Sequence, residues 1–191
     1  KAALREENLS YILNEAVEQA EAHAHILDVN VGLPEIDERA MLCKVVSAVQ
    51  SVTDLPLQLD SADPSALEGA MRIYCGKPLI NSVNGEKEKM DALFPLVKKY
   101  GGALIALAMD ETGIPNTAAE RVAIIEKIIS EAGKYGIEKK DIIADPLCLT
   151  VSSDQKSALV TLEAVRMLRE RGIKTSLGVS NISFGLPERE K

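Results

Sequence analysis

The sequence predicts an α/β fold with parallel strands, and we expect these strands to belong to a (β/α)8 barrel. Short apolar runs alternate with longer amphipathic stretches through the 191 residues, as in a chain of strand–helix units. Aspartate and asparagine close most of the apolar runs, at the strand ends that form the mouth of a barrel. The length suits one domain with a sizeable core.

Six short strands are expected, each followed by a helix or by the start of one. They are placed at residues 25–31, 56–60, 78–81, 103–108, 141–145 and 175–180. No G-x-G-x-x-G follows a strand, which disfavours an open dinucleotide-binding sheet. Apolar residues at helical spacing predict helices at residues 2–22, 35–52, 86–100 and 118–135, with others from Pro64 to Gly76, from Ser152 or Ser153 to Arg171, and from Pro187 onward.

Capping residues mark two of the helix starts. Asp63 precedes Pro64, which predicts an aspartate N-cap with proline at the first helical position. Thr117 and Glu120 have the spacing of a capping box. Both signals predict where an amphipathic stretch becomes a helix.

The composition excludes two classes of partner. The net charge of −7 gives an acidic surface, which repels nucleic acid and anionic membranes. No apolar run reaches the ~18 residues of a membrane span, and no signal-peptide pattern is present. We therefore expect a cytoplasmic protein. Its core must be built from Ala, Val, Ile and Leu, because aromatic residues are only 3% of the chain.

Cysteines and histidines do not form a metal-binding pattern. Cys43, Cys75 and Cys148 are far apart, and no Cys/His pair has metal-ligand spacing. The cysteines are expected to be reduced and mostly buried, as in cytosolic proteins. His23 and His25 lack a recognisable third ligand and are expected to be structural, so no bound metal is predicted.

Polar side chains at the strand ends are the candidate site. Each one alone could be a helix cap or a turn residue, but a common barrel mouth explains the set better. Carboxylates and carboxamides without Lys or Arg suit a neutral heterocycle with N–H donors rather than a phosphate. No Ser/His/Asp or Cys/His set points to nucleophilic catalysis. The candidates are Asp28, Asn30, Asp60, Asn81, Asp145 and Asn181.

Short motifs around these residues run in one order over nearly the whole chain. They are Leu27-Asp-Val-Asn-Val-Gly32, Leu59-Asp-Ser61, Lys77-Pro-Leu-Ile-Asn-Ser82, Met90-Asp91 with Phe94-Pro95, Asp145-Pro-Leu147 and Gly178-Val-Ser-Asn-Ile-Ser-Phe-Gly-Leu-Pro187. In this set and order they resemble the pterin-binding domains of methyltetrahydrofolate:corrinoid methyltransferases, including the folate domain of cobalamin-dependent methionine synthase. Any one motif is weak, and the ordered set carries the resemblance.

The resemblance implies a (β/α)8 barrel of the pterin-binding, dihydropteroate synthase-like type, with methyltetrahydrofolate at its mouth. Carried over by position, Asp60, Asn81 and Asp145 hold the pterin. Asp145 is then the bidentate partner of a ring N–H and the 2-amino group. Asp28 and Asn30 lie in a strand motif of the family and are further candidate pterin contacts.

The resemblance also implies a reaction. A methyl group moves between N5 of tetrahydrofolate and the cobalt of a corrinoid (cobalamin) carried by a partner protein or domain, and either direction is open. Asn181 lies near N5, both as a pterin contact and as the candidate catalytic residue. It can donate a hydrogen bond that strengthens as negative charge develops on N5. Family members are often homodimers, which is the oligomeric state we expect.

Two features depart from the family's pattern. Phe184 stands where some members have Gln, so polar assistance from that position is absent. The family's first strand is expected before Lys1 and its last strand after Lys191, so we expect a fragment that forms an incomplete barrel. Such a fragment leaves open an alternative from another class, a folate-binding module without turnover.

Dihydropteroate synthase is the nearest enzyme alternative, because it shares the pterin-binding barrel. It needs basic residues near the final strands for a diphosphate leaving group and an aminobenzoate. The motif Ser180-Asn181-Ile182 has no Lys or Arg beside it, which favours the methyltransferase.

Overall fold

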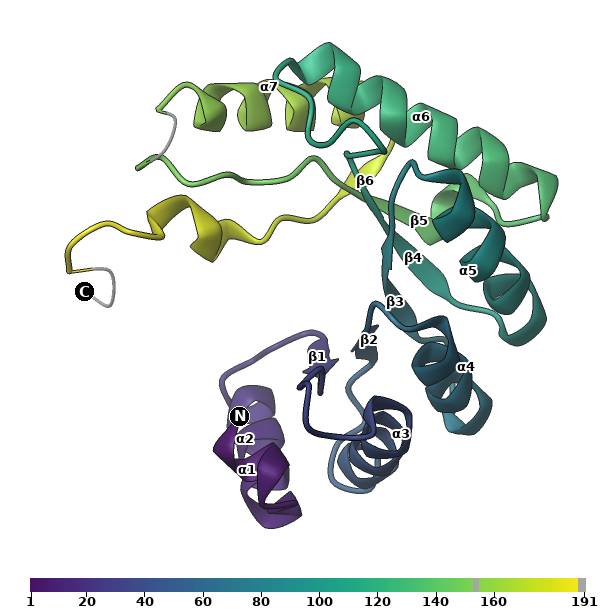
Figure 1. Cartoon of the computed structure of the whole chain (residues 1–191), viewed down its shortest axis with the longest axis vertical. Coiled ribbons are helices and arrows are strands. Elements are labelled where there is room, and N and C mark those ends of the chain that lie inside the picture. Colours follow the sequence, from purple (N-terminus) through teal and green to yellow (C-terminus); the bar gives the residue numbers. More distant parts are fainter. Residues whose placement is uncertain (153–154, 189–191) are drawn as a thin grey trace. The chain divides into compact units, whose positions relative to one another are not determined.

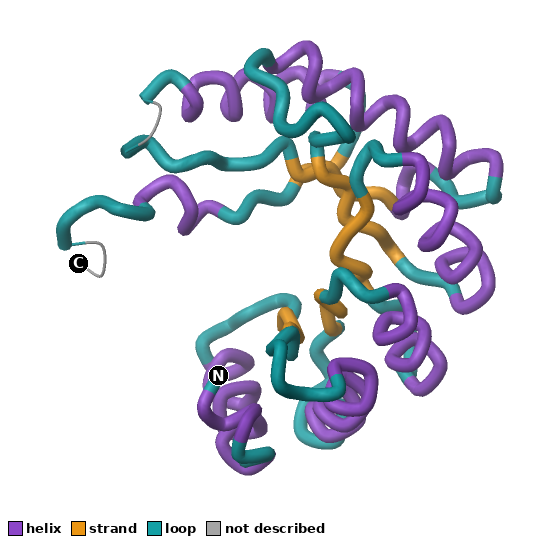
Figure 2. Tube along the Cα trace, in the orientation of Figure 1, coloured by secondary structure: helices purple, strands orange, loops and turns teal. Residues whose placement is uncertain are grey.

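Two compact units make up the chain in the computed structural model, which describes residues 1–152 and 155–188. Unit 1 is Lys1–Ser82 with Leu96–Ala103, and unit 2 is Val83–Pro95 with Leu104–Lys191. Strands alternate with helices in each unit (Figure 1, Figure 2). This alternation confirms the α/β organisation that the sequence predicts.

In the described part of the chain, unit 1 contains three parallel strands. β1 (Leu27–Asn30) pairs with β2 (Leu57–Asp60), and β2 pairs with β3 (Leu79–Val83). α5 (Lys87–Tyr100) follows β3 and has residues in both units. The other helices of unit 1 are α1 (Ala2–Arg5), α2 (Leu9–Glu21), α3 (Glu38–Val49) and α4 (Pro64–Ile73).

Alternating apolar residues of the strands build the core of unit 1 together with α3 and α4. Leu57 and Leu59 of β2 are fully buried, as is Leu42 of α3. α3 and α4 approach closely because Gly69 of α4 has no side chain, and a Cβ there would lie 3.0 Å from Cys43 Sγ. Since strand side chains alternate between faces, the polar positions of β1 and β2 are left on the face opposite this core.

Unit 2 has the same layered organisation. β4 (Ala103–Leu107) pairs in parallel with β5 (Ile142–Asp145), and β5 pairs in parallel with the two-residue β6 (Lys174–Thr175). α6 and α7 pack against each other and run side by side in Figure 1. Their bounds, with those of the two 3-10 turns, are α6 (Ala118–Lys134), α7 (Ser157–Glu170), η1 (Lys139–Asp141) and η2 (Val179–Ser183).

The core of unit 2 is aliphatic, as the composition predicts. Leu104 of β4 and Ile142 of β5 are completely buried, and so are Ile125 and Ile128 of α6 and Leu168 of α7. Burying a side chain of this size stabilises the fold by about 1.5–3 kcal/mol. The core therefore fixes β5, whose carboxyl end carries Asp145.

The predicted helix caps are confirmed. The Asp63 side chain accepts a hydrogen bond from Ser65 N at 2.8 Å, and Thr117 Oγ1 accepts one from Glu120 N at 3.3 Å. None of the helices in the described part of the chain is both long and apolar enough to cross a membrane.

The single helix expected for residues 2–22 is wrong, because two helices cover this stretch. The chain leaves helical geometry around Glu7, whose φ is 49°. Asn8 then accepts a hydrogen bond from Tyr11 N at 3.1 Å and starts α2. Asparagine offers the backbone a local partner outside the helix, and this interruption is not visible in the apolar spacing.

Two expectations near the end of the chain are also corrected. α7 begins at Ser157, whereas Ser152 donates a hydrogen bond from its hydroxyl to the carbonyl of Phe184 at 2.9 Å. Ser153 lies outside the described residues. The strand expected at 175–180 ends at Thr175. Pro187 and Glu188 form a turn, and the rest of the helix expected from Pro187 onward lies outside the described residues.

The cysteines have different environments. Among the described residues all three are free: Cys148 is buried, Cys43 is partly buried and Cys75 is exposed. The expectation of mostly buried thiols is therefore wrong for Cys75.

Loss of the α4 cap tests the contribution of local structure. We expect Asp63→Ala to lower the free energy of unfolding by ~1 kcal/mol, because Ser65 N loses its acceptor. Urea denaturation of the parent and the variant measures the difference. Asp54→Ala, at an exposed position outside any helix, is the control and should change stability by less. Equal effects of the two substitutions would contradict the cap assignment.

Candidate functional site

Three predicted site residues of unit 1 lie in one row at the carboxyl ends of its strands. The parallel register pairs Asn30 with Asp60 and Asp60 with Asn81. Asn30 Nδ2 donates a hydrogen bond to Asp60 Oδ2 at 2.9 Å, and Asn30 Oδ1 accepts one from Gly32 N at 3.0 Å. Asn30 thus uses both ends of its amide within the protein, and it orients the Asp60 carboxylate.

A second polar pair lies one layer below this row. Asp28 faces Gln58 in the register, and Gln58 Nε2 donates a hydrogen bond to Asp28 Oδ1 at 2.6 Å. Desolvation raises the pKa of the Asp28 carboxyl, the bond from Gln58 lowers it, and the neighbouring Asp60 charge raises it further. The polar face of unit 1 is therefore two residues deep.

The loop after β2 is fixed by further hydrogen bonds. The buried Ser61 donates to Glu38 Oε1 at 2.5 Å and accepts from Asp63 N at 3.0 Å. Its backbone N–H donates to the carbonyl of Asn81 at 3.1 Å. These bonds tie Ser61, the residue that follows Asp60, to β3 and to the start of α3.

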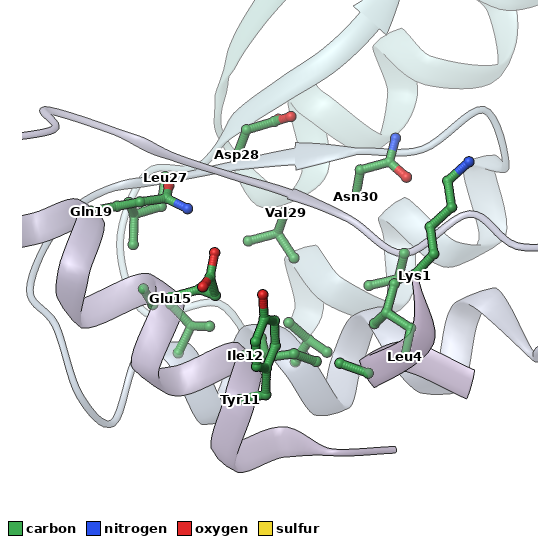
Figure 3. Close-up of a pocket in the computed structure, with 15 residues that line it drawn as sticks. Lys1, Leu4, Tyr11, Ile12, Glu15, Gln19, Leu27, Asp28, Val29 and Asn30 are labelled. Atoms are coloured by element: carbon green, nitrogen blue, oxygen red, sulfur yellow. The ribbon is translucent and has the colours of Figure 1, made fainter. Parts of the chain in front are cut away.

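A cavity lies beside β1. It measures about 200 Å³ and is lined by α1, α2, β1 and α3. Figure 3 shows Val29 pointing toward Tyr11 and Glu15 of α2, whereas Asp28 and Asn30 point away from them. The residues that line the cavity also include Asp28 and Asn30, so the cavity adjoins the polar positions of β1.

Asp145 of unit 2 ends β5, as the sequence predicts. Its Oδ1 accepts a hydrogen bond from Leu147 N at 2.8 Å. Burial raises the pKa of the Asp145 carboxyl, and the Leu147 N–H opposes that shift. A carboxylate has about four acceptor directions, so Asp145 keeps the capacity to accept a parallel pair of hydrogen bonds from a ligand.

Asn181 does not end a strand as predicted, but lies in the 3-10 turn η2 and is exposed. The turn is closed by bonds from Asn181 N to the carbonyl of Gly178 and from Phe184 N to the carbonyl of Asn181, both 3.1 Å. A Cβ at residue 178 would lie 3.0 Å from Asn181 Nδ2. Glycine at 178 therefore leaves room for the Asn181 side chain.

Some residues that support the candidate site are not among those predicted from the sequence. Gln58 occupies the polar phase of an alternating strand, and this alternation is a signal that could have found it. Arg121 lies between apolar residues of the buried α6 face, yet it is only 2% exposed. An arginine within the apolar stripe of a helix is a second such signal. Arg121 contacts the two residues that follow Asp145.

The fold and the polar strand ends define a class of protein: an α/β chain of the barrel type with carboxylates and carboxamides at the carboxyl ends of its strands. The particular family follows from comparison, because a family model described as "pterin binding enzyme" matches residues 2–190. The chain belongs to this family.

Similar proteins include a methyltransferase and a methionine synthase. The chain is 37% identical over 196 residues to a methylcorrinoid:tetrahydrofolate methyltransferase of Eubacterium limosum, covering 100% of this chain and 72% of the relative. It is 32% identical over 198 residues to methionine synthase of Mycobacterium tuberculosis, covering 97% of this chain but 17% of that protein. These similarities confirm the family that the motifs indicate.

Solved structures of dihydropteroate synthases share the fold. The Xanthomonas albilineans enzyme has a TM-score of 0.75 at 20% identity, covering 92% of this chain and 66% of that one. The Thermus thermophilus enzyme has a TM-score of 0.74 at 23% identity, covering 94% and 72%. The predicted fold class, the pterin-binding type of barrel, is confirmed, and the described residues contain six of the strands of such a barrel.

Asn30→Asp tests the row in unit 1, because it places two carboxylates opposite each other. We expect it to lower the free energy of unfolding by ~1 kcal/mol near neutral pH, through like-charge repulsion between paired strands. The repulsion needs both groups ionised, so the loss should disappear in acid. Urea denaturation of the parent and the variant at neutral pH and in acid measures the loss of stability. Asn14→Asp, on an exposed position of α2, is the control, and an equal loss at both pH values would argue against the Asn30–Asp60 contact.

Proposed function

We propose that this chain catalyses methyl transfer between N5 of tetrahydrofolate and the cobalt of a corrinoid protein. The observation that carries the proposal is the 37% identity, over the whole chain, to a methylcorrinoid:tetrahydrofolate methyltransferase. Under this proposal the partners are a folate and a corrinoid-binding protein or domain. The chain acts as a homodimer in the cytoplasm.

Pterin recognition is assigned to carboxylates and carboxamides at strand ends. Asp145 accepts two parallel hydrogen bonds, from a ring N–H and the 2-amino group. This assignment is supported by two observations: the carboxylate is half-buried, and Leu147 N donates a hydrogen bond at 2.8 Å to Oδ1, one of its two oxygens. Asp60 and Asn81 contribute further contacts, and they share one register row at the ends of β2 and β3.

The two remaining candidates in unit 1 receive supporting roles. Asn30 donates to Asp60 and thereby fixes the direction of that carboxylate. Asp28 is bonded to Gln58 one layer deeper. In this proposal both residues keep the pterin-binding face polar, and contact between them and the pterin is secondary.

Asn181 is assigned to the reacting nitrogen. The corrinoid, when its carrier is bound, supplies the metal that accepts or donates the methyl group. An amine is a poor leaving group, so charge that develops on N5 has to be relieved by a proton or a hydrogen bond. The Asn181 amide donates such a bond, and its exposed turn leaves it accessible to both substrates.

The absence of a basic residue beside Asn181 in the sequence favours methyl transfer over dihydropteroate synthesis. A diphosphate leaving group needs positive charge, and Ser180-Asn181-Ile182 has no Lys or Arg beside it. The similarity to dihydropteroate synthases is below 25% identity and concerns the fold. We therefore assign no diphosphate chemistry to this chain.

Asp145→Asn separates pterin binding from folding. We expect the affinity for methyltetrahydrofolate to fall about 100-fold or more, because an amide presents an N–H to one of the two ligand donors. Stability should be equal or higher at neutral pH. The pKa of Asp145 is raised by burial, so its ionised form opposes folding above that pKa, and the gain should vanish as the pH falls through it. Calorimetry and thermal denaturation measure both effects, and unchanged affinity would refute the pterin assignment.

Asn181→Ala separates binding from chemistry. We expect calorimetric affinity for methyltetrahydrofolate within about 3-fold of the parent, but methyl exchange with Co(I) cobalamin slowed about 100-fold, as for other transition-state hydrogen bonds. Ser183→Ala, in the same turn, is the matched control and should retain exchange. Equal exchange rates for parent and Asn181→Ala would remove Asn181 from the reaction, and a parent that binds but does not exchange methyl would identify a folate-binding module.

A further inference from the structure

A buried guanidinium lies directly behind the loop that follows Asp145. Arg121 of α6 is 2% exposed and is the largest fully buried side chain among the described residues. Burying a charged group is unfavourable unless its donors are bonded, and desolvation accordingly lowers the pKa of Arg121. A buried arginine therefore needs a reason to be retained at this position.

The bonds of Arg121 go to one loop and its surroundings. Nη1 donates to the carbonyls of Pro146 at 3.0 Å and Leu147 at 2.9 Å, the two residues after Asp145. Nε donates to the carbonyl of Pro115 at 2.9 Å. All of these acceptors are backbone oxygens, so the guanidinium fixes the path of the chain rather than pairing with a charge.

Thr161 of α7 contacts the same loop, and we call the contacts that Arg121 and Thr161 make with Pro146 and Leu147 the clamp. Its buried Oγ1 lies 3.2 Å from Arg121 Nη1, 2.9 Å from the carbonyl of Leu147 and 3.1 Å from the carbonyl of Ser157 in the same helix. The hydroxyl can therefore accept from the guanidinium and donate its one proton to the nearer acceptor, the carbonyl of the loop. The Leu147 carbonyl is thus held from both α6 and α7.

The clamped residue is in an unusual conformation. Leu147 has φ of 66°, in the left-handed region that side chains other than glycine rarely adopt. Such a conformation persists only where the surroundings enforce it. This geometry brings Leu147 N to 2.8 Å from Asp145 Oδ1, and that bond sets the rotation of the carboxylate.

We propose that Arg121, with Thr161, is a positioning residue for Asp145: the clamp on Pro146 and Leu147 orients the carboxylate for paired hydrogen bonds to a pterin. The inference rests on the proposed pterin-binding role of Asp145. It adds that recognition of the 2-amino group depends on a side chain on α6 that does not touch the ligand.

Comparing two ligands tests this role independently of the folded fraction. The ligands are methyltetrahydrofolate and its analogue lacking the 2-amino group, and the readout is the ratio of their dissociation constants. The parent should favour the natural ligand about 10-fold to 100-fold, because a misaligned or missing donor leaves the carboxylate unpaired. A purely structural loss weakens both ligands equally and leaves the ratio unchanged.

The variants are Arg121→Met, Arg121→Lys and Thr161→Val. We expect Arg121→Met to reduce the ratio to about 1–3, Arg121→Lys to restore part of it, and Thr161→Val to reduce it several-fold. Arg166→Met, which removes an exposed α7 arginine paired with Glu163 and Glu170, should leave it unchanged. If Arg121→Met does not fold, Arg121→Lys and the nearly isosteric Thr161→Val decide.

The outcomes separate this inference from the proposed function. A parental ratio in folded Arg121 and Thr161 variants would overturn the positioning role, while loss of the ratio in Asp145→Asn would still support Asp145 as the pterin partner. A parent that binds neither ligand, or binds both equally, would refute the role of Asp145 and the inference with it. If the ratio of dissociation constants falls in the Arg121 and Thr161 variants but stays at the parental value in Arg166→Met, the positioning role of Arg121 and Thr161 is supported.

Discussion

The register of the parallel strands is the constraint on which the candidate site depends. In unit 1 it brings Asn30, Asp60 and Asn81, from three separate stretches of sequence, into one row at the strand ends. Because side chains alternate between the two faces of a strand, a shift of one residue would exchange the polar row for the buried Leu59 and Ile80. The aliphatic core therefore fixes the register, and the register in turn places the site residues of this unit.

Two carboxylates of the candidate site are partly desolvated, which opposes folding, and the structure compensates for them by local hydrogen bonds. Asp28 and Asp145 both have pKa values raised by desolvation, and each accepts one bond, from Gln58 and from Leu147 N respectively. Neither carboxylate is bonded to its full capacity by these contacts. A site kept in this state trades stability for the ability to bind a ligand with several donors.

Much of the fold could be predicted because each element has a local signal. The strand ends at Asp60 and Asp145 and the cap at Thr117 follow from apolar periodicity and capping chemistry. Other features depend on contacts distant in sequence. The bond from Ser152 to Phe184 joins residues far apart in the chain, and the turn that carries Asn181 replaces the expected strand end. The partners of the site residues, such as Gln58 and Arg121, become visible only when the register and the helix packing are known.

The polar pair Asp28–Gln58 has a consequence for hydration. Below Asn30 and Asp60 the strands of unit 1 present an amide and a carboxylate rather than hydrocarbon, and such groups hold ordered water by hydrogen bonds. A ring lying on the Asn30–Asp60 row would rest on hydrogen-bonding groups instead of hydrocarbon.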